Sequence, residues 1–96
     1  MLTGKQKRYL RSLGSALDPV VQIGKGGVTE PVVTSAQDVI GARELIKVRV
    51  LKNCAEEPKD AISELADATD SVLVQMIGRN GLLYKKHPEN PRIELP

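Results

Sequence analysis

The sequence is short of aromatic residues: it contains no Phe and no Trp, and its two aromatic side chains are Tyr9 and Tyr84. Domains that bind single-stranded RNA on an exposed sheet stack successive bases on several aromatic rings. This chain cannot assemble such a surface, and its core must be aliphatic. Any contact with a nucleic acid is therefore expected to fall on phosphates and sugars, so that shape matters more than base sequence.

Cysteine and histidine are also scarce, with Cys54 and His87 the single example of each. A lone cysteine forms no internal disulfide and fits a reducing compartment. The two residues lie far apart in the sequence, so no Cys–His nucleophile pair and no zinc ligand set can be written. We interpret Cys54 as a half-buried apolar residue and His87 as a solvated residue of a Pro-rich tail. The sequence predicts no enzyme, no bound metal and no cofactor.

Long apolar runs are missing, because charged residues interrupt every stretch within about ten residues, well short of a membrane span. No apolar segment of signal-peptide type follows the charges at the N-terminus. We expect no membrane association and a cytoplasmic location. The 96 residues support one domain with a modest core. A monomer is expected, because no long apolar stripe remains once the predicted helices are packed.

The net charge of +2 is unevenly distributed. Residues 1–27 hold five bases and one acid, residues 28–70 hold five bases and nine acids, and residues 71–96 hold four bases and two acids. The three segments therefore carry net charges of +4, −4 and +2. This segregation predicts a basic side, which attracts polyanions over a Debye length of about 8 Å in physiological salt, and an acidic side.

The first predicted element is a helix that a Thr3 cap begins and that runs to about Leu17. At about 100° per residue, its apolar residues gather on one side and its bases on the other. The apolar side is formed by Leu2, Tyr9, Leu10, Leu13 and Leu17, and the basic side by Lys5, Lys7, Arg8 and Arg11. Asp18-Pro19 ends the helix, because the residue before a proline disfavours the helical conformation.

The β-rich run at 20–23 predicts a strand, and the loop Gly24-Lys25-Gly26-Gly27 follows it. Thr29 is expected to cap a second helix, with Gly41 as its C-terminal cap. Residues 45–50 alternate apolar and basic side chains, which predicts a strand with one buried and one solvated face.

The rest of the chain predicts one more helix and a hairpin. The helix begins at Pro58 and carries an acidic face, and residues 72–77 predict a strand. Asn80-Gly81 predicts a hairpin turn, residues 82–86 return as the last strand, and residues 87–96 form an extended or loosely ordered tail. The predicted fold class is α/β with the order α-β-α-β-α-β-β, a four-stranded mixed sheet packed with three helices.

The loop between the first strand and the second helix is the strongest candidate site. Glycines let a backbone approach a phosphate closely, and free N–H groups at a helix N-terminus favour an anion. Gly26 follows Lys25 where a Walker A motif needs Ser or Thr, and Thr29 stands where a dinucleotide motif needs Gly. The loop does satisfy the Gly-x-x-Gly pattern of a nucleic-acid backbone clamp. Taken alone, it is equally compatible with a tight turn that exposes a lysine.

The position of the loop favours a polyanion partner. The basic first helix leads directly into the strand that precedes the loop, so its four bases are predicted to share a surface with Lys25. Lys85 and Lys86 of the last strand are candidates for the same surface. The predicted RNA-binding residues are Lys5, Lys7, Arg8, Arg11, Gly24, Lys25, Gly26, Gly27, Lys85 and Lys86.

The order of these residues resembles a known family. The matching segments are Leu2-Thr3-x-Lys5-Gln6-Lys7, Leu10-Arg11, Pro19-x-x-Gln22-Ile23-Gly24-Lys25-Gly26-Gly27, Glu44-Leu45-Ile46-Lys47-Val48-Arg49 and Asn90-Pro91-x-Ile93-Glu94-Leu95-Pro96. They are similar to the CRM domain in its free-standing bacterial YhbY-type form, and they span essentially the whole chain, so the resemblance makes residues 1–96 a single CRM-type domain. It implies a fold similar to the C-terminal domain of a bacterial translation initiation factor. It also implies RNA binding, through the loop at 24–27 and the basic first helix.

In that family, bacterial members associate with precursors of the large ribosomal subunit, and plant organelle relatives act in group II intron splicing. The leading hypothesis is therefore a non-catalytic protein that binds ribosomal RNA or a large-subunit precursor. Two alternatives stay open at this stage. One is a phosphate- or nucleotide-binding enzyme that uses the loop, and the other is an adaptor that binds ribosomal proteins through the acidic third helix.

Overall fold

The computed structural model describes residues 2–96, which form three helices and four strands in the predicted order. The helices are α1 (Gly4–Gly14), α2 (Glu30–Arg43) and α3 (Pro58–Thr69), and the strands are β1 (Pro19–Ile23), β2 (Leu45–Val50), β3 (Val72–Ile77) and β4 (Asn80–Tyr84). The strands make one sheet in the order β1-β2-β4-β3. The β1–β2 pair is parallel and the other two pairs are antiparallel, so the predicted mixed α/β sheet is confirmed.

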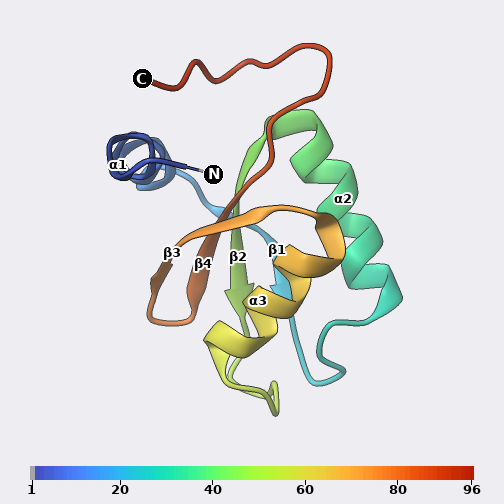
Figure 1. Cartoon of the computed structure of the whole chain (residues 1–96). Helices are drawn as coiled ribbons and strands as arrows, with labels where there is room; N and C mark the ends of the chain where they lie inside the picture. The colour runs from blue at the N-terminus through green and yellow to red at the C-terminus, as the bar shows by residue number, and fades with distance from the viewer. Residues whose placement is uncertain (1) are drawn as a thin grey trace.

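Helix α1 lies on one face of the sheet, and α2 and α3 lie on the other face (Figure 1). Inward residues of all four strands contact α2 and α3 in the larger of two buried clusters, around Ile23, Val48 and Leu83. The smaller cluster joins Leu10 of α1 to Leu45, Val74, Leu82 and Tyr84 on the other face. Successive side chains of a strand point to opposite faces of the sheet. A strand therefore contributes residues to both clusters, or to one cluster while its other side chains are exposed.

Helix α1 begins as predicted but ends early. Thr3 caps it, and Gln6 returns a hydrogen bond to the Thr3 backbone, which completes a capping box. The helix ends at Gly14, three residues before the predicted end at Leu17. The missing side chain of Gly14 explains why: a Cβ there would lie 2.6 Å from Leu82, so the backbone rests directly on the sheet before it turns toward β1.

This close approach also changes which side of α1 is buried. Leu10 and Gly14 face the sheet, whereas Tyr9 and Leu13 are 38% and 36% exposed. The prediction that both belong to the buried stripe is wrong. The face of α1 that meets the sheet is the one that carries Leu10 and Gly14. Lys7 and Arg11 are therefore half-buried beside the sheet, while Lys5 and Arg8 stay exposed.

The end of α2 also differs from the prediction. The helix continues through the exposed Gly41 to Arg43, and Glu44 is its cap with a positive φ of 65°. The prediction of a Gly41 cap is wrong. Glu44 adopts this unusual conformation because its side chain is 1% exposed and fixed by backbone donors of the tail.

The hairpin turn lies two residues before the predicted one. Gly78 and Arg79 form the turn, whereas Asn80 and Gly81 belong to β4. Gly78 supplies the positive φ of 58° that a two-residue hairpin turn requires. Gly81 serves close packing instead, because a Cβ there would lie 2.5 Å from Ile62 of α3. Strand β4 ends at Tyr84, so Lys85 and Lys86 follow the strand.

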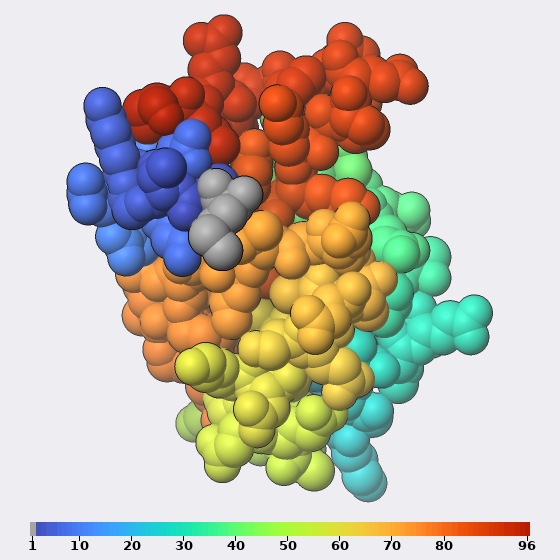
Figure 2. Space-filling view, in the orientation of Figure 1, coloured from blue at the N-terminus to red at the C-terminus, as the bar shows by residue number. Residues whose placement is uncertain are grey.

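The tail carries no helix or strand, yet it is fixed to the rest of the molecule. The carboxylate of Glu44 accepts hydrogen bonds from the backbone N–H groups of His87, Arg92 and Ile93. Ile93 and Leu95 pack against the smaller cluster, and Gln6 of α1 donates to the Pro96 carbonyl. Figure 2 shows the end of the tail lying against α1. Among residues 2–96, no helix is long and apolar enough to cross a bilayer.

Candidate nucleic-acid interface

The alternating sequence of β2 sorts its residues onto the two faces of the sheet. Ile46, Val48 and Val50 belong to the cluster under α2 and α3. Lys47 and Arg49 therefore point to the other face, where their partners in β4 are Leu82 and Asn80. Helix α1 covers only part of that face, so Lys47 is half-buried and Arg49 is exposed. These two bases lie at the centre of the sheet.

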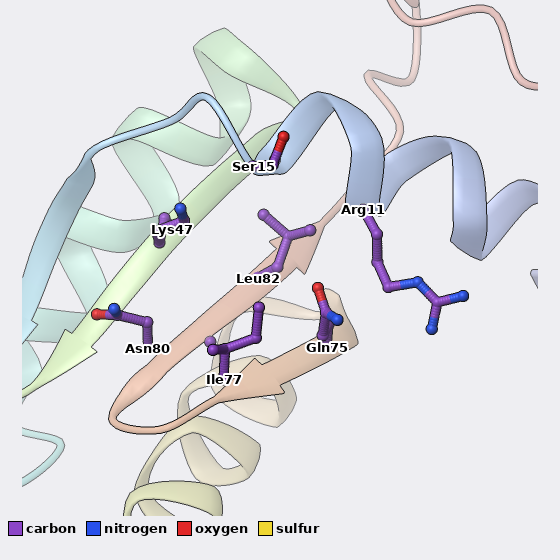
Figure 3. A pocket seen from close by; sticks show the side chains of 9 residues that line it. Arg11, Ser15, Lys47, Gln75, Ile77, Asn80 and Leu82 are labelled. Carbon is purple, nitrogen blue, oxygen red and sulfur yellow. The ribbon is translucent and has the colours of Figure 1, made fainter.

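Helix α1 borders this open part of the sheet with its own bases. Arg11 and Lys47 line the same hollow on opposite sides of Leu82, and the Arg11 side chain extends past Gln75, away from Lys47 (Figure 3). Lys7 lies one turn earlier on the same side of the helix, while Lys5 and Arg8 point further toward solvent. We call the six bases of α1 and β2 together the basic face: Lys5, Lys7, Arg8, Arg11, Lys47 and Arg49.

The basic face is built from elements that contain no acidic residue. Neither α1 nor any of the four strands includes an Asp or Glu. Helix α3, on the opposite side of the sheet, contains Asp60, Glu64 and Asp67 against the single base Lys59. The uneven charge along the sequence thus becomes two faces of opposite sign. Unopposed cations produce a local positive potential that attracts a polyanion.

One exposed acid near the basic face is Asp18, in the connection between α1 and β1. It borders the same surface depression as Lys47 and Arg43. Asp18 therefore marks one edge of the basic face, beside the start of β2.

The glycine loop lies beyond the opposite end of β1. The N–H of Gly27 donates to the Gly24 carbonyl at 3.0 Å, which closes a tight turn with Lys25 and Gly26 exposed at its tip. Gly27 has a φ of 72°, a conformation that favours glycine. A Cβ on Gly27 would lie 3.0 Å from a Glu56 carboxylate oxygen. Because one N–H is used within the turn and an acid stands beside it, the Lys25 side chain is the group of the loop best suited by charge and exposure to meet an anion.

The loop and α1 are not adjacent, and β2 connects them. Nine residues, 15–23, separate the end of α1 from Gly24, and the last five of them form β1. In the register of the sheet, Arg49 lies beside Gln22 and Val50 beside Ile23, immediately before the loop. Lys47 and Arg49 are two residues apart, about 6.6 Å along a strand. The bases of α1 and β2 therefore form a track that runs toward the end of β1, where the loop of Lys25 begins.

Lys85 and Lys86 do not lie on this track. The Lys85 ammonium donates to the Thr69 carbonyl at the end of α3, at 3.1 Å. Lys86 borders a shallow depression beside Gln37 and Gly41 of α2, on the other side of the sheet from α1. The structure therefore separates these two predicted site residues from the other eight. Arg79 is also occupied, because its guanidinium caps the Val50 and Leu51 carbonyls.

Lys47 and Arg49 were missing from the sequence-based site. The alternation of β2 did predict that they face solvent, but only the order of strands shows that this solvated face is also the one bordered by α1. Cys54 and His87, the single cysteine and the single histidine, both take part in the packing or hydrogen bonding of the fold. Cys54 is buried in the larger cluster, and His87 Nδ1 accepts from the Glu89 and Asn90 N–H groups. Within residues 2–96, no three His, Cys, Asp or Glu side chains are grouped as metal ligands.

Comparisons with known proteins agree with this architecture. The sequence model of the CRS1 / YhbY (CRM) domain matches residues 2–85. The chain is similar to the probable RNA-binding protein YqeI of Bacillus subtilis, with 50% identity over 96 residues and full coverage of both chains. It is 36% identical over 95 residues to an RNA-binding protein of Haemophilus influenzae, covering 99% of this chain and 95% of the relative. The solution structure of a hypothetical Staphylococcus aureus protein superposes with a TM-score of 0.83 at 51% identity, over 100% of both chains.

Proposed function

The chain belongs to the CRS1 / YhbY (CRM) domain family, and from this premise we propose that it is a non-catalytic RNA-binding protein whose principal contact is the basic face together with Lys25. The observation that carries the proposal is electrostatic. Six bases project from α1 and β2, and these two elements and the other strands contain no acid. Several relatives bear names that describe RNA-binding proteins.

The proposed contact is with the phosphate backbone of structured RNA. Lysine and arginine neutralise phosphates and release counterions, which binds RNA without reading its sequence. The chain has two tyrosines and no Phe or Trp, so an extended base-stacking platform is unavailable to it. We propose ribosomal RNA, in a precursor of the large subunit, as the partner, which follows from the family resemblance.

A pair of charge reversals tests the proposed surface. Arg49→Glu and Lys59→Glu change the net charge equally, but Arg49 lies on the basic face and Lys59 is exposed on α3 across the sheet. Arg49→Glu is expected to weaken binding to a fragment of large-subunit RNA by tenfold or more in about 100 mM salt, as expected when a phosphate contact becomes a repulsion. Lys59→Glu is expected to change it less than threefold, because only a long-range effect remains.

Further arms distinguish the other parts of the proposal. Lys25→Glu tests whether the loop extends the contact beyond the end of β1. Titration with mononucleotides tests the enzyme alternative, since tight binding of one of them favours a small-ligand site. Equal weakening by Arg49→Glu and Lys59→Glu would show that only net charge matters and would remove the basic face as the binding surface.

A further inference from the structure

A hollow lies between α1 and the β3–β4 hairpin, at the centre of the basic face. Arg11 and Gly14 of α1 form one side of it, Lys47 the other, and Leu82, Gln75 and Ile77 form its floor and lower rim. Its volume is about 110 Å³ and its inner surface is mainly apolar. Ligand pockets for whole small molecules measure about 300–1,000 Å³, so this hollow fits one small planar group.

The hollow exposes apolar side chains, whereas a solvated sheet face usually carries polar ones. Ile77 is 65% exposed, the highest exposure of any large apolar residue in the part of the chain described. Figure 3 shows Ile77 and Gln75 next to Leu82, with the Arg11 guanidinium on one side and Lys47 on the other. An apolar floor, the two amides of Gln75 and Asn80 and two flanking cations are thus brought together by α1 and three strands.

We propose that this hollow receives one unpaired base of the bound RNA, an inference that rests on the proposed function and specifies where on the basic face it acts. The flat faces of a base are apolar and would lie against Leu82 and Ile77. The Gln75 amide offers a donor and an acceptor to the edge of the base. Arg11 can stack its planar guanidinium on the base or pair with a flanking phosphate, and Lys47 takes the other flanking phosphate.

The structure also explains why the hollow exists beside α1. The Gly14 backbone rests on Leu82, which brings α1 close enough for Arg11 to line the hollow. The helix ends immediately afterwards, so the tip of the hairpin, residues 77–80, extends beyond its cover. One hollow with an aliphatic floor thus accommodates a single base in a chain that has no Phe or Trp.

The test compares a fully paired RNA duplex with the same duplex carrying one bulged 2-aminopurine nucleotide. Ile77→Ala and Gln75→Ala alter the hollow without changing charge. Val72→Ala is the control, because Val72 is a 42% exposed apolar residue of the same strand outside the hollow. Wild type is expected to prefer the bulged duplex and to raise 2-aminopurine emission as the base leaves the stack.

Ile77→Ala and Gln75→Ala are each expected to lower the affinity for the bulged RNA by about three- to tenfold, as for partial loss of one base contact. They should leave the paired duplex and the salt dependence unchanged, and Val72→Ala should resemble wild type. If wild type binds both RNAs equally and both variants match it, the base site is overturned while the proposed function stands. If wild type binds neither RNA, the proposed function fails and the base site fails with it.

Discussion

The buried carboxylate of Glu44 is expected to hold the C-terminal tail against α1, and its removal should destabilise the protein. One of its oxygens accepts from the N–H groups of Arg92 and Ile93, and the other from the N–H of His87. The donors are 43 to 49 residues away in the sequence. Glu44→Ala removes all three bonds and releases the half-buried Ile93 from the smaller cluster.

The size of the effect follows from the number of bonds and from what the tail can recover. A hydrogen bond to a charged group contributes about 1.5–3 kcal/mol net, but freed N–H groups of a released tail are rehydrated. We therefore expect Glu44→Ala to lower the free energy of unfolding by about 2–4 kcal/mol, below the full sum. For a domain of this size, about 1 kcal/mol shifts Tm by about 4–8 °C, so Tm should fall by at least about 8 °C.

A graded variant sharpens the prediction. Glu44→Gln can keep one oxygen on Arg92 and Ile93, but its amide NH2 then faces the N–H of His87, and two donors cannot bond. Its Tm should therefore lie between those of wild type and Glu44→Ala. Glu94→Ala removes the same charge from an exposed position of the tail and should change the stability by less than about 0.5 kcal/mol.

The pH dependence has a fixed sign. Burial raises the pKa of Glu44, but the three backbone N–H groups and the nearby His87 outweigh it, so the pKa lies below the usual value of 4.5. A depressed pKa in the folded state gives stability that is complete above pH 4.5 and is lost as the pH falls through the lower folded value. The Tm difference between wild type and Glu44→Gln should shrink in that range. Thermal denaturation followed by circular dichroism measures both effects. Identical Tm values for Glu44→Ala and Glu94→Ala would refute the reasoning.

Three further predictions address the basic face, the packing and the smaller cluster. With seven phosphate contacts, from the basic face and Lys25, log K against log salt should have a slope of about −5 to −6. Arg49→Ala should reduce its magnitude by roughly 0.7–0.9 in a titration at several salt concentrations. Gly81→Ala should destabilise the protein by about 1–3 kcal/mol, because its Cβ would meet Ile62 at 2.5 Å. Gly41→Ala, in open space on α2, should stabilise the protein by about 0.5–1 kcal/mol. Urea titrations measure both free energies of unfolding, and equal effects would contradict the packing argument. Burial, followed by the charge of Glu44, raises the pKa of Tyr84 above 10.0, so its contribution to stability is complete below pH 10.0 and is lost as the pH rises through the folded value; Tyr84→Phe should abolish this alkaline loss in melting curves.

Elements that local patterns specify were predictable from the sequence. The Thr3–Gln6 capping box, the alternation of β2 and the β-rich run of β3 each fix an element within one stretch of chain. The differences arise where a distant residue decides. Gly14 ends α1 because it rests on Leu82, and periodicity within the helix carries no information about that contact.

Glycine positions illustrate the same limit. Asn80-Gly81 has the composition of a hairpin turn, but Gly81 is required by Ile62 of α3, which leaves Gly78 to make the turn. A turn motif reports which backbone conformations are available and does not report which glycine must leave room for a neighbouring side chain. Likewise, the Glu44 cap depends on donors in the tail, so helix signals around Gly41 could not locate the end of α2.

The site was predictable to the extent that its residues belong to one element. The helix pattern grouped the bases of α1, and glycine content marked the loop. How the bases of α1 lie relative to the loop depends on the order of the strands, which places Lys47 and Arg49 between them. Where β4 ends decides that Lys85 lies at the end of α3, where it binds the Thr69 carbonyl. Contacts between elements therefore decided which of the predicted residues share a surface.

The acid closest to the start of β2 shows how the fold keeps the basic face unopposed. Glu44 directly precedes Leu45, and an exposed carboxylate there would lower the positive potential beside α1. Instead the carboxylate is buried, and the partial positive charges of three backbone N–H groups surround it. The same bonds fix the tail, whose last residues hold α1 through Gln6. One buried acid thus both anchors the helix that supplies most of the bases and has its own charge offset by the backbone it binds.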